Sequence, residues 1–274
     1  MKKILFLDID NTLYSGKSGI VPESAMHAVK EARANGHPVF LCTGRSKAEA
    51  SRYLAFPVDG FIFSSGTLIT VGGKTVYDHP IAPEKVEEIA GLVRSCGMGV
   101  LMGGAQRAYL DAKCWGDVVN YFSRPEADAD TKLRDMRSNG MAPMEQRDRN
   151  DPVYKMGAST NHGTSFEPLL KILPPPFRLI HTLSSPEGDF GDISDGSIMK
   201  SDGIRRVLEY TGMNVNDSVG IGDSGNDIDM IRFCGTGIAM GNADEEVKQA
   251  ADWVTSDIDE DGIRNAFLHL GIIG

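Results

Sequence analysis

Short apolar runs alternate with helix-like segments at both ends of this 274-residue chain. In the first third, the runs are ILFL at 4–7, PVFLCT at 38–43 and GFIFS at 60–64. In the last third, SVGIG at 218–222, GIAM at 237–240 and DWVT at 252–255 repeat the rhythm. Strands and helices that alternate along a chain build parallel βαβ units. The pattern therefore predicts an α/β fold with a doubly wound parallel sheet to which both ends of the chain contribute.

Helical spacing and capping signals predict the segments between these strands. Ala25, Val29 and Ala32 recur at helical spacing within 22–36. Ser46 and Glu49 have the spacing of a capping box, which predicts a helix just after the CTGR sequence. Further helices are expected at about 202–211, 226–234 and 245–251.

The middle of the chain does not continue this rhythm. The sequence of residues 83–97 predicts a helix, and the stretch 123–152 is polar and rich in charge. The three prolines of LPPPF at 173–177 exclude this stretch from the interior of a helix. We therefore expect a core domain formed by 1–82 and 190–274, with an α+β domain inserted at 83–189. Such an insertion would act as a lid that excludes water and contacts the substrate.

The charge balance and the apolar runs restrict the partners. The chain has 28 Lys+Arg against 38 Asp+Glu, a formal net charge of -10, which argues against a surface that binds nucleic-acid phosphates. The first apolar run ends at Asp8 and is too short for a signal peptide, and no run approaches the roughly 18 apolar residues of a membrane span. The four cysteines lack metal-binding spacing. We expect a cytoplasmic protein with reduced thiols, and neither a nucleic-acid nor a membrane partner.

Carboxylates follow two of the expected strands at their carboxyl ends. Asp8 and Asp10 follow the first strand, and Asp223 and Asp227 follow the strand at 218–222. In open parallel sheets, ligands bind beyond the carboxyl ends of the strands, where the strand order changes direction. If the N-terminal strands lie on one side of the first strand and the C-terminal strands on the other, the four aspartates converge in one crevice.

Four converging carboxylates would repel one another, which predicts a bound cation. Oxygen ligands without a nearby His or Cys favour Mg²⁺ over zinc, and protein-bound Mg²⁺ usually keeps coordination positions for substrate phosphate and water. The Thr43 hydroxyl, the Lys200 ammonium group and the backbone N–H groups beside Gly44 would suit phosphate oxygens.

These residues resemble the motifs of a known family. In this order, DIDNT at 8–12, LCTGR at 41–45, Lys200 and GDSGND at 222–227 look like the four motifs of the haloacid dehalogenase superfamily. The chain is most similar to its Cof-type phosphatases, in which a large type IIB cap lies between the second and third motifs. The resemblance implies a Rossmann-like catalytic core, an inserted α+β cap, Mg²⁺ as cofactor, and hydrolysis of a small phosphate monoester such as a sugar phosphate or a phosphorylated cofactor.

The resemblance also implies catalytic and phosphate-binding residues. Asp8 would be the nucleophile that forms an aspartyl-phosphate, and Asp10 would be the general acid and then the general base. Thr43, followed by Gly44, would bind a phosphoryl oxygen. Lys200 would offset the charge of the nucleophile and the phosphate.

The implied metal ligands overlap with this set. Asp8, Asp223 and the backbone carbonyl of Asp10 would bind the metal directly. Asp227 would hold the metal or a water bound to it. Asn226 would contact the phosphate or brace its loop, or it would only cap the following helix. Asp229 is expected to face solvent and is left out of the set.

Two positions depart from the family's pattern. SSGTLI at 64–69 stands where members often have an Asn-Gly pair, and Asn11 replaces a frequent Gly after the second acid. The first departure affects a substrate contact and the second affects the geometry of the loop. The inserted segment also contains four basic residues that either contact an anionic substrate or are surface charges. They are Arg107, Lys113, Arg147 and Lys155.

Other functions fit the same residues. A phosphomutase or phosphotransferase would pass the phosphoryl group to a sugar hydroxyl instead of water. A non-catalytic sensor would bind a phosphate ligand without turnover. GIGDSG at 220–225 fits a dinucleotide fingerprint, but Asp223 and Asp227 would repel a pyrophosphate. The leading expectation is a phosphatase, a monomer or homodimer, that acts on a small phosphorylated metabolite.

Overall fold

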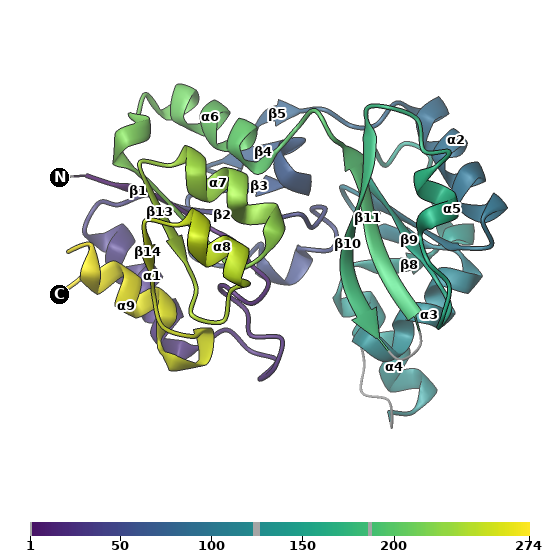
Figure 1. The fold of residues 1–274 in the computed structure, drawn as a ribbon, viewed down its shortest axis with the longest axis horizontal. Helices are drawn as coiled ribbons and strands as arrows, with labels where there is room; N and C mark the ends of the chain where they lie inside the picture. Colours follow the sequence, from purple (N-terminus) through teal and green to yellow (C-terminus); the bar gives the residue numbers. More distant parts are fainter. Residues whose placement is uncertain (1, 123–126, 186–187) are drawn as a thin grey trace. The chain divides into compact units, whose positions relative to one another are not determined.

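The computed structural model describes residues 2–122, 127–185 and 188–274, which form two compact units (Figure 1). Unit 1 comprises Met1–Gly44, Phe56–Asp78 and Ile198–Gly274, and unit 2 comprises Arg45–Ala55 and His79–Ser197. The division expected from the sequence, at 82 and 190, differs from these bounds in one main respect. It placed residues 45–55 in the core, whereas they belong to the unit formed by the middle of the chain.

Unit 1 is built on an eight-stranded sheet with β1 in its middle. The strand order is β14 (Trp253–Val254), β13 (Thr236–Ala239), β12 (Ser218–Gly222), β1 (Ile4–Leu7), β2 (Val39–Cys42), β3 (Gly60–Phe63), β4 (Leu68–Val71) and β5 (Lys74–Asp78). Neighbours from β14 to β3 are parallel, and β4 and β5 continue the sheet in antiparallel orientation. The predicted α/β class is confirmed, with strands from the two ends of the chain on opposite sides of β1.

Helices cover this sheet because its strands are apolar on both faces. The helices are α1 (Glu23–Ala34), α6 (Lys200–Thr211), α7 (Ile228–Phe233), α8 (Glu245–Ala250) and α9 (Gly262–His269). Ile4 and Phe6 of β1 belong to one apolar cluster with Ile204 of α6 and Met230 of α7. Alternate residues of a strand point to opposite faces, so Leu5, also fully buried, faces the other side of the sheet. On the ribbon, α1 and α9 lie side by side (Figure 1).

One local prediction is wrong, and one local feature was not predicted. Ser46 and Glu49 do form the reciprocal hydrogen bonds of a capping box, with Ser46 N to Glu49 Oε2 at 2.8 Å and Glu49 N to Ser46 Oγ at 3.4 Å. No α-helix follows, however, only turns and a short 3₁₀ helix at Ser51–Tyr53. The hairpin of β4 and β5 was not expected. Gly72 and Gly73 form its turn with positive φ angles of 55° and 78°, a conformation that glycine adopts without strain.

Unit 2 is an α+β unit with a six-stranded sheet. The strand order is β10 (Phe177–Ser185), β11 (Gly188–Asp195), β9 (Val153–Ser159), β6 (Gly99–Gly104), β7 (Ala108–Leu110) and β8 (Met141–Pro143). Its helices are α2 (Pro83–Ser95), α3 (Ala112–Phe122), α4 (Ala129–Ser138) and α5 (Glu167–Leu170). All neighbouring strands are antiparallel except β7 and β8.

Two apolar clusters stabilise unit 2, one on each face of its sheet. Val100 of β6 packs in one cluster with Ile89 of α2. Leu101, the next residue, packs in the other with Cys114 of α3 and with Ala48 from the segment 45–55. That segment is therefore part of the hydrophobic core of unit 2.

The described residues contain no helix that is both long and apolar enough to cross a bilayer. All four cysteines are free, and three of them, Cys42, Cys114 and Cys234, are buried. Burial raises the pKa of the Cys234 thiol to about 12, so this side chain packs as a small neutral group.

Candidate active site

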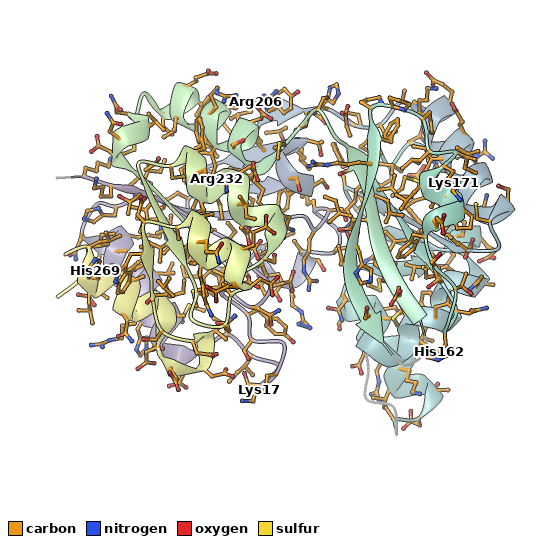
Figure 2. All side chains as sticks on the ribbon, viewed as in Figure 1. Lys17, His162, Lys171, Arg206, Arg232 and His269 are labelled. Atoms are coloured by element: carbon orange, nitrogen blue, oxygen red, sulfur yellow. The ribbon has the colours of Figure 1, made fainter. Side chains whose placement is uncertain are left out.

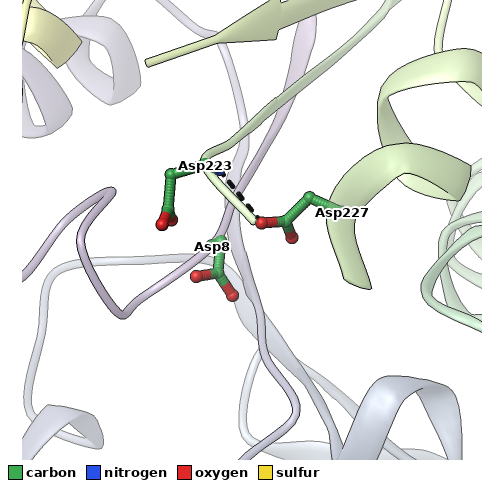
Figure 3. A group of neighbouring side chains, drawn as sticks. All are labelled: Asp8, Asp223 and Asp227. Carbon is green, nitrogen blue, oxygen red and sulfur yellow. Dashed lines mark hydrogen bonds between the residues drawn. The ribbon is translucent and has the colours of Figure 1, made fainter. Parts of the chain in front are cut away.

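Three buried carboxylates meet at the carboxyl edge of the unit 1 sheet. Asp8 directly follows β1, and Asp223 directly follows β12, the parallel neighbour of β1. Asp227 ends the 3₁₀ turn Gly225–Asp227, which follows β12 and leads into α7. One oxygen from each carboxylate lies within 4.8 Å of the others (Figure 3). The strand order therefore brings together residues that are more than 200 positions apart in the sequence.

Lys200 is the cation that contacts this group. Its Nζ donates a hydrogen bond of 2.6 Å to Asp8 Oδ1 and another to Asp227 Oδ1. Lys200 is 1% exposed, so both contacts lie out of water. A buried ammonium group is costly unless it is paired and hydrogen-bonded, and these two carboxylates supply both conditions.

Asp227 shapes the loop between β12 and α7. Its Oδ2 accepts hydrogen bonds from the backbone N–H groups of Asp223 and Ser224, at 3.0 and 3.1 Å. Gly222 makes this approach possible, because a Cβ there would lie 2.4 Å from the Asp227 Cβ. With Lys200 at the other oxygen, both oxygens of Asp227 already accept hydrogen bonds.

Asp223 is oriented by Thr12, a residue that the sequence analysis did not assign. The Thr12 hydroxyl is fully buried and donates a hydrogen bond of 2.8 Å to Asp223 Oδ1. Thr12 is the last residue of the DIDNT stretch, and no spacing rule links it to a partner 211 positions away. The second oxygen of Asp223 and the second oxygen of Asp8 accept no hydrogen bond from the described residues.

Burial and the charges of neighbouring acids raise the pKa values of Asp8 and Asp223. The pKa of Asp223 rises to about 7, because of its burial and then because of the charge of Asp227. Burial also raises the pKa of Asp8 well above its ordinary value; Lys200 opposes this rise, and Asp227, Asp223 and Asp10 add to it. Burial would lower the pKa of Lys200, but Asp227 and Asp8 outweigh that effect and raise it. The cluster therefore holds more negative charge than one lysine can neutralise.

The donor set suits a hard divalent cation. It consists of carboxylate oxygens, two of which carry no hydrogen bond from the described residues. Mg²⁺ and Ca²⁺ take oxygen ligands, whereas zinc prefers nitrogen and sulfur. A second cation beside Lys200 would also remove the electrostatic cause of the raised pKa values.

Asp10 lies near this group but outside it. Its charge raises the pKa values of both Asp8 and Asp223, yet its carboxyl is not one of the three that gather among the described residues. Asp10 pairs in an isolated parallel bridge with Tyr14, and Asn11, with a positive φ of 54°, turns the loop between them. The Asn242 side chain donates 2.8 Å to the carbonyl of Asn11 and so anchors this loop.

The remaining sequence candidates lie on the same unit. Thr43 directly follows β2 and is 1% exposed, with Gly44 after it at the end of a chain segment of unit 1. Asn226 does not cap α7; its Oδ1 accepts a hydrogen bond of 2.8 Å from the Ser224 hydroxyl, and Ser224 is the residue that caps the turn. This contact lies within the loop between β12 and α7, and a phosphate contact by Asn226 stays a prediction.

Asp229 was expected to face solvent and not the metal, and it lies outside the group of three carboxylates. The side chain is half-buried, and its Oδ2 accepts a hydrogen bond of 2.7 Å from the backbone N–H of Ser201. Asp202 accepts another, of 3.0 Å, from the N–H of Met199. These two carboxylates accept hydrogen bonds from backbone N–H groups at the start of α6 that have no partner within the helix. Lys200 is the first residue of this helix. The two carboxylates therefore fix the position of Lys200 without contacting it.

Unit 2 contains a second buried lysine. Most ionisable side chains, among them Lys17, His162 and Lys171, reach solvent (Figure 2). Lys155, in contrast, is 4% exposed and pairs with Asp192 at 2.7 Å and with Glu49 at 3.4 Å. It therefore joins β9 to β11 and to the segment 45–55.

Two of the other cations considered for substrate contact also have partners inside unit 2. Lys113 pairs with Asp117 at 2.8 Å, and Arg147 pairs with Glu87 at 2.6 Å. Together with the buried Lys155, they are held by neighbouring acids and do not form a group of free positive charges.

Comparison with known proteins agrees with this geometry. A family model described as haloacid dehalogenase-like hydrolase matches residues 5–267. YkrA, a protein of Bacillus subtilis (strain 168) that bears a phosphatase name, is 28% identical over 99% of this chain and 98% of its own length. The phosphatase YcsE of the same organism, named for 5-amino-6-(5-phospho-D-ribitylamino)uracil, is 27% identical over 97% of this chain and 95% of its own length.

Solved structures extend the comparison to the fold. A structure described as the subclass IIB sugar phosphatase BT4131 superposes with a TM-score of 0.75 at 29% identity, over 99% of this chain and 100% of that chain. Another, described for a trigonal-bipyramidal intermediate in a phosphoryl-transfer superfamily, gives 0.78 at 29% identity over the full length of both chains. The chain belongs to the haloacid dehalogenase-like hydrolases and is a Cof-type, phosphatase-like member of that family.

Proposed function

We propose that this protein is a Mg²⁺-dependent phosphatase that hydrolyses a small phosphate monoester through an aspartyl-phosphate on Asp8. The observation that carries the proposal is the buried group of Asp8, Asp223 and Asp227 beside Lys200. In a chain that matches a hydrolase family over 5–267, this group has the residues that phosphoryl transfer needs. The proposal adds the metal, the reaction path and the substrate class to the family membership.

Asp8 and Asp223 would hold the metal through their oxygens that lack hydrogen bonds, and the backbone carbonyl of Asp10 would be a third ligand. Asp227, whose oxygens already accept from Lys200 and two backbone N–H groups, would orient this set or hold a metal-bound water. When bound, a divalent cation supplies positive charge that stabilises the transferred phosphoryl group.

Asp8 acts as the nucleophile only when it is ionised. Burial favours its protonated form, and the charge of Lys200 opposes that effect. An oxygen of Asp8 attacks phosphorus, the bond from phosphorus to the substrate oxygen breaks, and Asp10 gives its proton to the leaving alkoxide. Asp10 then takes a proton from water, which attacks the aspartyl-phosphate and releases phosphate and free Asp8. Thr43 and Lys200 bind the phosphoryl oxygens during both steps.

The substrate class rests on the relatives. BT4131 is described as a sugar phosphatase, and YcsE is named for a phosphoribityl compound; both names denote a phosphate on a small polyhydroxylated carbon chain. We therefore propose a sugar phosphate or a phosphorylated cofactor as substrate, and unit 2 as the cap that contacts its leaving group. The same proposal assigns Asn226 to the phosphate loop.

The test is phosphate release from a panel of phosphate monoesters, with and without Mg²⁺, by the wild type and by Asp8→Asn. Asp8→Asn should lower turnover at least about 10³-fold, because an amide cannot form the acyl phosphate. Asp259→Asn, a change of the same size at an exposed acid of unit 1, is the matched control and should keep full activity. Full activity of Asp8→Asn would refute the mechanism, and an isomerised sugar phosphate without free phosphate would assign the protein to the phosphomutases.

A further inference from the structure

A pocket lies at the edge of the unit 1 sheet opposite to the carboxylates. It has a volume of about 490 Å³. Its lining comes from the start of the chain, the last turns of α1, the loop before β2 and the residue before β3, and comprises Lys2, Lys30, Arg33, Ala34, Gly36, His37, Pro38 and Asp59. These positions precede the parallel strands, whereas Asp8 follows β1. The length of β1, at about 3.3 Å per residue, separates the two edges.

The pocket is basic in a chain whose formal net charge is -10. Three of its lining residues, Lys2, Lys30 and Arg33, are cations, and Asp59 is the one acid among them. Asp59 is already paired, because Arg33 donates to both of its oxygens at 2.9 and 2.8 Å. Burial would raise the pKa of Asp59, but the hydrogen bonds from Arg33 and Val39 and the charges of Arg33 and Lys2 together outweigh burial and lower the pKa. The two lysines therefore leave the pocket with an excess of positive charge.

Asp59 also fixes the geometry of the pocket. In addition to Arg33, it accepts a hydrogen bond of 2.9 Å from the backbone N–H of Val39, the first residue of β2. The two hydrogen bonds to Asp59 therefore hold the Arg33 guanidinium in one orientation, and the bond from Val39 fixes Asp59 to the sheet. A planar guanidinium held in this way retains other N–H groups for a second acceptor.

His37 adds a hydrogen-bond donor with a defined tautomer. Its Nδ1 accepts a hydrogen bond of 3.0 Å from the backbone N–H of Lys3. In the neutral ring the proton is therefore on Nε2, which is an N–H donor. Burial lowers the pKa of His37, and the charge of Lys2 contributes to the decrease, so the ring is neutral at physiological pH. The lining of the pocket thus combines a neutral imidazole with two ammonium groups and one guanidinium.

From this arrangement we infer that the pocket binds a small phosphorylated molecule at a site separate from the carboxylate cluster. Phosphate dianions accept charge-assisted hydrogen bonds from the groups present here: guanidinium, ammonium and imidazole N–H. The volume lies within the range of about 300–1,000 Å³ that small-molecule sites occupy, which leaves room for more than the phosphate itself. The inference does not depend on the proposed catalytic mechanism.

The test uses inorganic phosphate as the probe and the ring resonances of His37 as the readout. The titration is done on the full chain without metal, because the uncompensated carboxylates beside Lys200 then repel anions from the other site. His37→Gln assigns the His37 signal among the six histidines. We expect a saturable shift of that signal, and affinity at least about tenfold weaker in the double variant Lys2→Gln/Lys30→Gln, since two charge-assisted contacts are lost.

Three controls keep the result interpretable. Lys74→Gln removes an exposed lysine of β5 outside the pocket and should bind phosphate as the wild type does. Lys2→Arg/Lys30→Arg keeps the charge and should retain binding. Chloride at the same ionic strength should produce no saturable shift. Absence of a saturable shift with phosphate, or equal affinity in the wild type and Lys2→Gln/Lys30→Gln, would overturn the inference whatever the enzyme's activity proves to be.

Discussion

Lys200 in unit 1 and Lys155 in unit 2 are both buried between carboxylates, but their surroundings differ in charge. Lys155 contacts Asp192 and Glu49. The charge of Arg45 also acts on this cluster, because it opposes the rise in the pKa of Asp192. Two cations thus face two acids. Among the described residues, Lys200 is the one cation hydrogen-bonded to the group of three acids, Asp8, Asp223 and Asp227, and it contacts the first and the last of them.

The difference separates a structural ion cluster from a site that can bind a further cation. Burial lowers the pKa of Lys155, but Asp192 and Glu49 reverse this and raise it, so the lysine stays charged between its partners. Around Lys200 the acids are in excess, and the pKa of Asp223 rises to about 7. A buried lysine is therefore not by itself a sign of chemistry. The sum of the charges around it distinguishes the two cases.

The same substitution at both lysines tests this comparison, with the largest effect at Lys200. Lys200→Met should lower turnover about 10³-fold or more, because Asp8, the proposed nucleophile, loses the charge that keeps it ionised and the substrate loses a proposed phosphoryl contact. Steady-state phosphate release measures this. Turnover within threefold of the wild type would show that Lys200 is as structural as Lys155.

Lys155→Met should act on stability instead. Removing the lysine leaves the buried acids Glu49 and Asp192 with the charge of Arg45 alone to offset them, and the free energy of unfolding should fall by about 3 kcal/mol. Urea unfolding followed by circular dichroism measures the loss, with Lys171→Met, an exposed lysine of unit 2, as the control. The loss should not be recovered by adding Mg²⁺; recovery would contradict the distinction between the two clusters.

The pH dependence of metal binding sharpens the comparison further. In the metal-free protein the folded pKa of Asp223 is about 7, above its value in the unfolded chain, so this group lowers stability as pH rises from about 4 to 7. Below pH 7, Mg²⁺ must displace a proton, and its apparent affinity should fall by up to about tenfold per pH unit. Calorimetry in two buffers of different ionisation enthalpy should detect proton release at pH 6 and little at pH 8.5. An affinity independent of pH from 5.5 to 8 would count against Asp223 as a ligand.

The smallest effect concerns the hydroxyl that orients Asp223. Thr12→Val keeps the shape of the side chain but removes the hydrogen bond to Asp223 Oδ1, which is worth about 1 kcal/mol. We expect Mg²⁺ to bind about fivefold more weakly. The matched change is Thr160→Val in unit 2, another buried threonine, which should leave Mg²⁺ binding unchanged. Equal Mg²⁺ affinity in Thr12→Val and the wild type would exclude an orienting role.

The strand ends were the most predictable part of the molecule. Asp8 and Asp223 each follow a short apolar run, and alternation with helices is enough to place those runs side by side in a parallel sheet. The β4–β5 hairpin carried a usable signal, since Gly72 and Gly73 separate two strand-like runs.

Other features had no local signal. The capping box at Ser46 and Glu49 formed as predicted, but the helix did not follow, because these residues serve the core of unit 2 instead: Ala48 packs with Leu101, and Glu49 contacts Lys155. The partner of Thr12 depends on tertiary structure alone. Lys155 could not be distinguished from a surface lysine, since its two partners come from distant parts of the chain.

The segment 45–55 limits how this protein can be recombined with its relatives. The chain passes between the units at 44–45, 55–56, 78–79 and 197–198, so unit 2 is encoded in two pieces. A chimera that exchanged only 79–197 would leave Ala48 facing a foreign counterpart of Leu101 and Met136. It would also separate Glu49 from Lys155. A transplantable cassette must therefore carry 45–55 as well, a segment that begins two residues after Thr43.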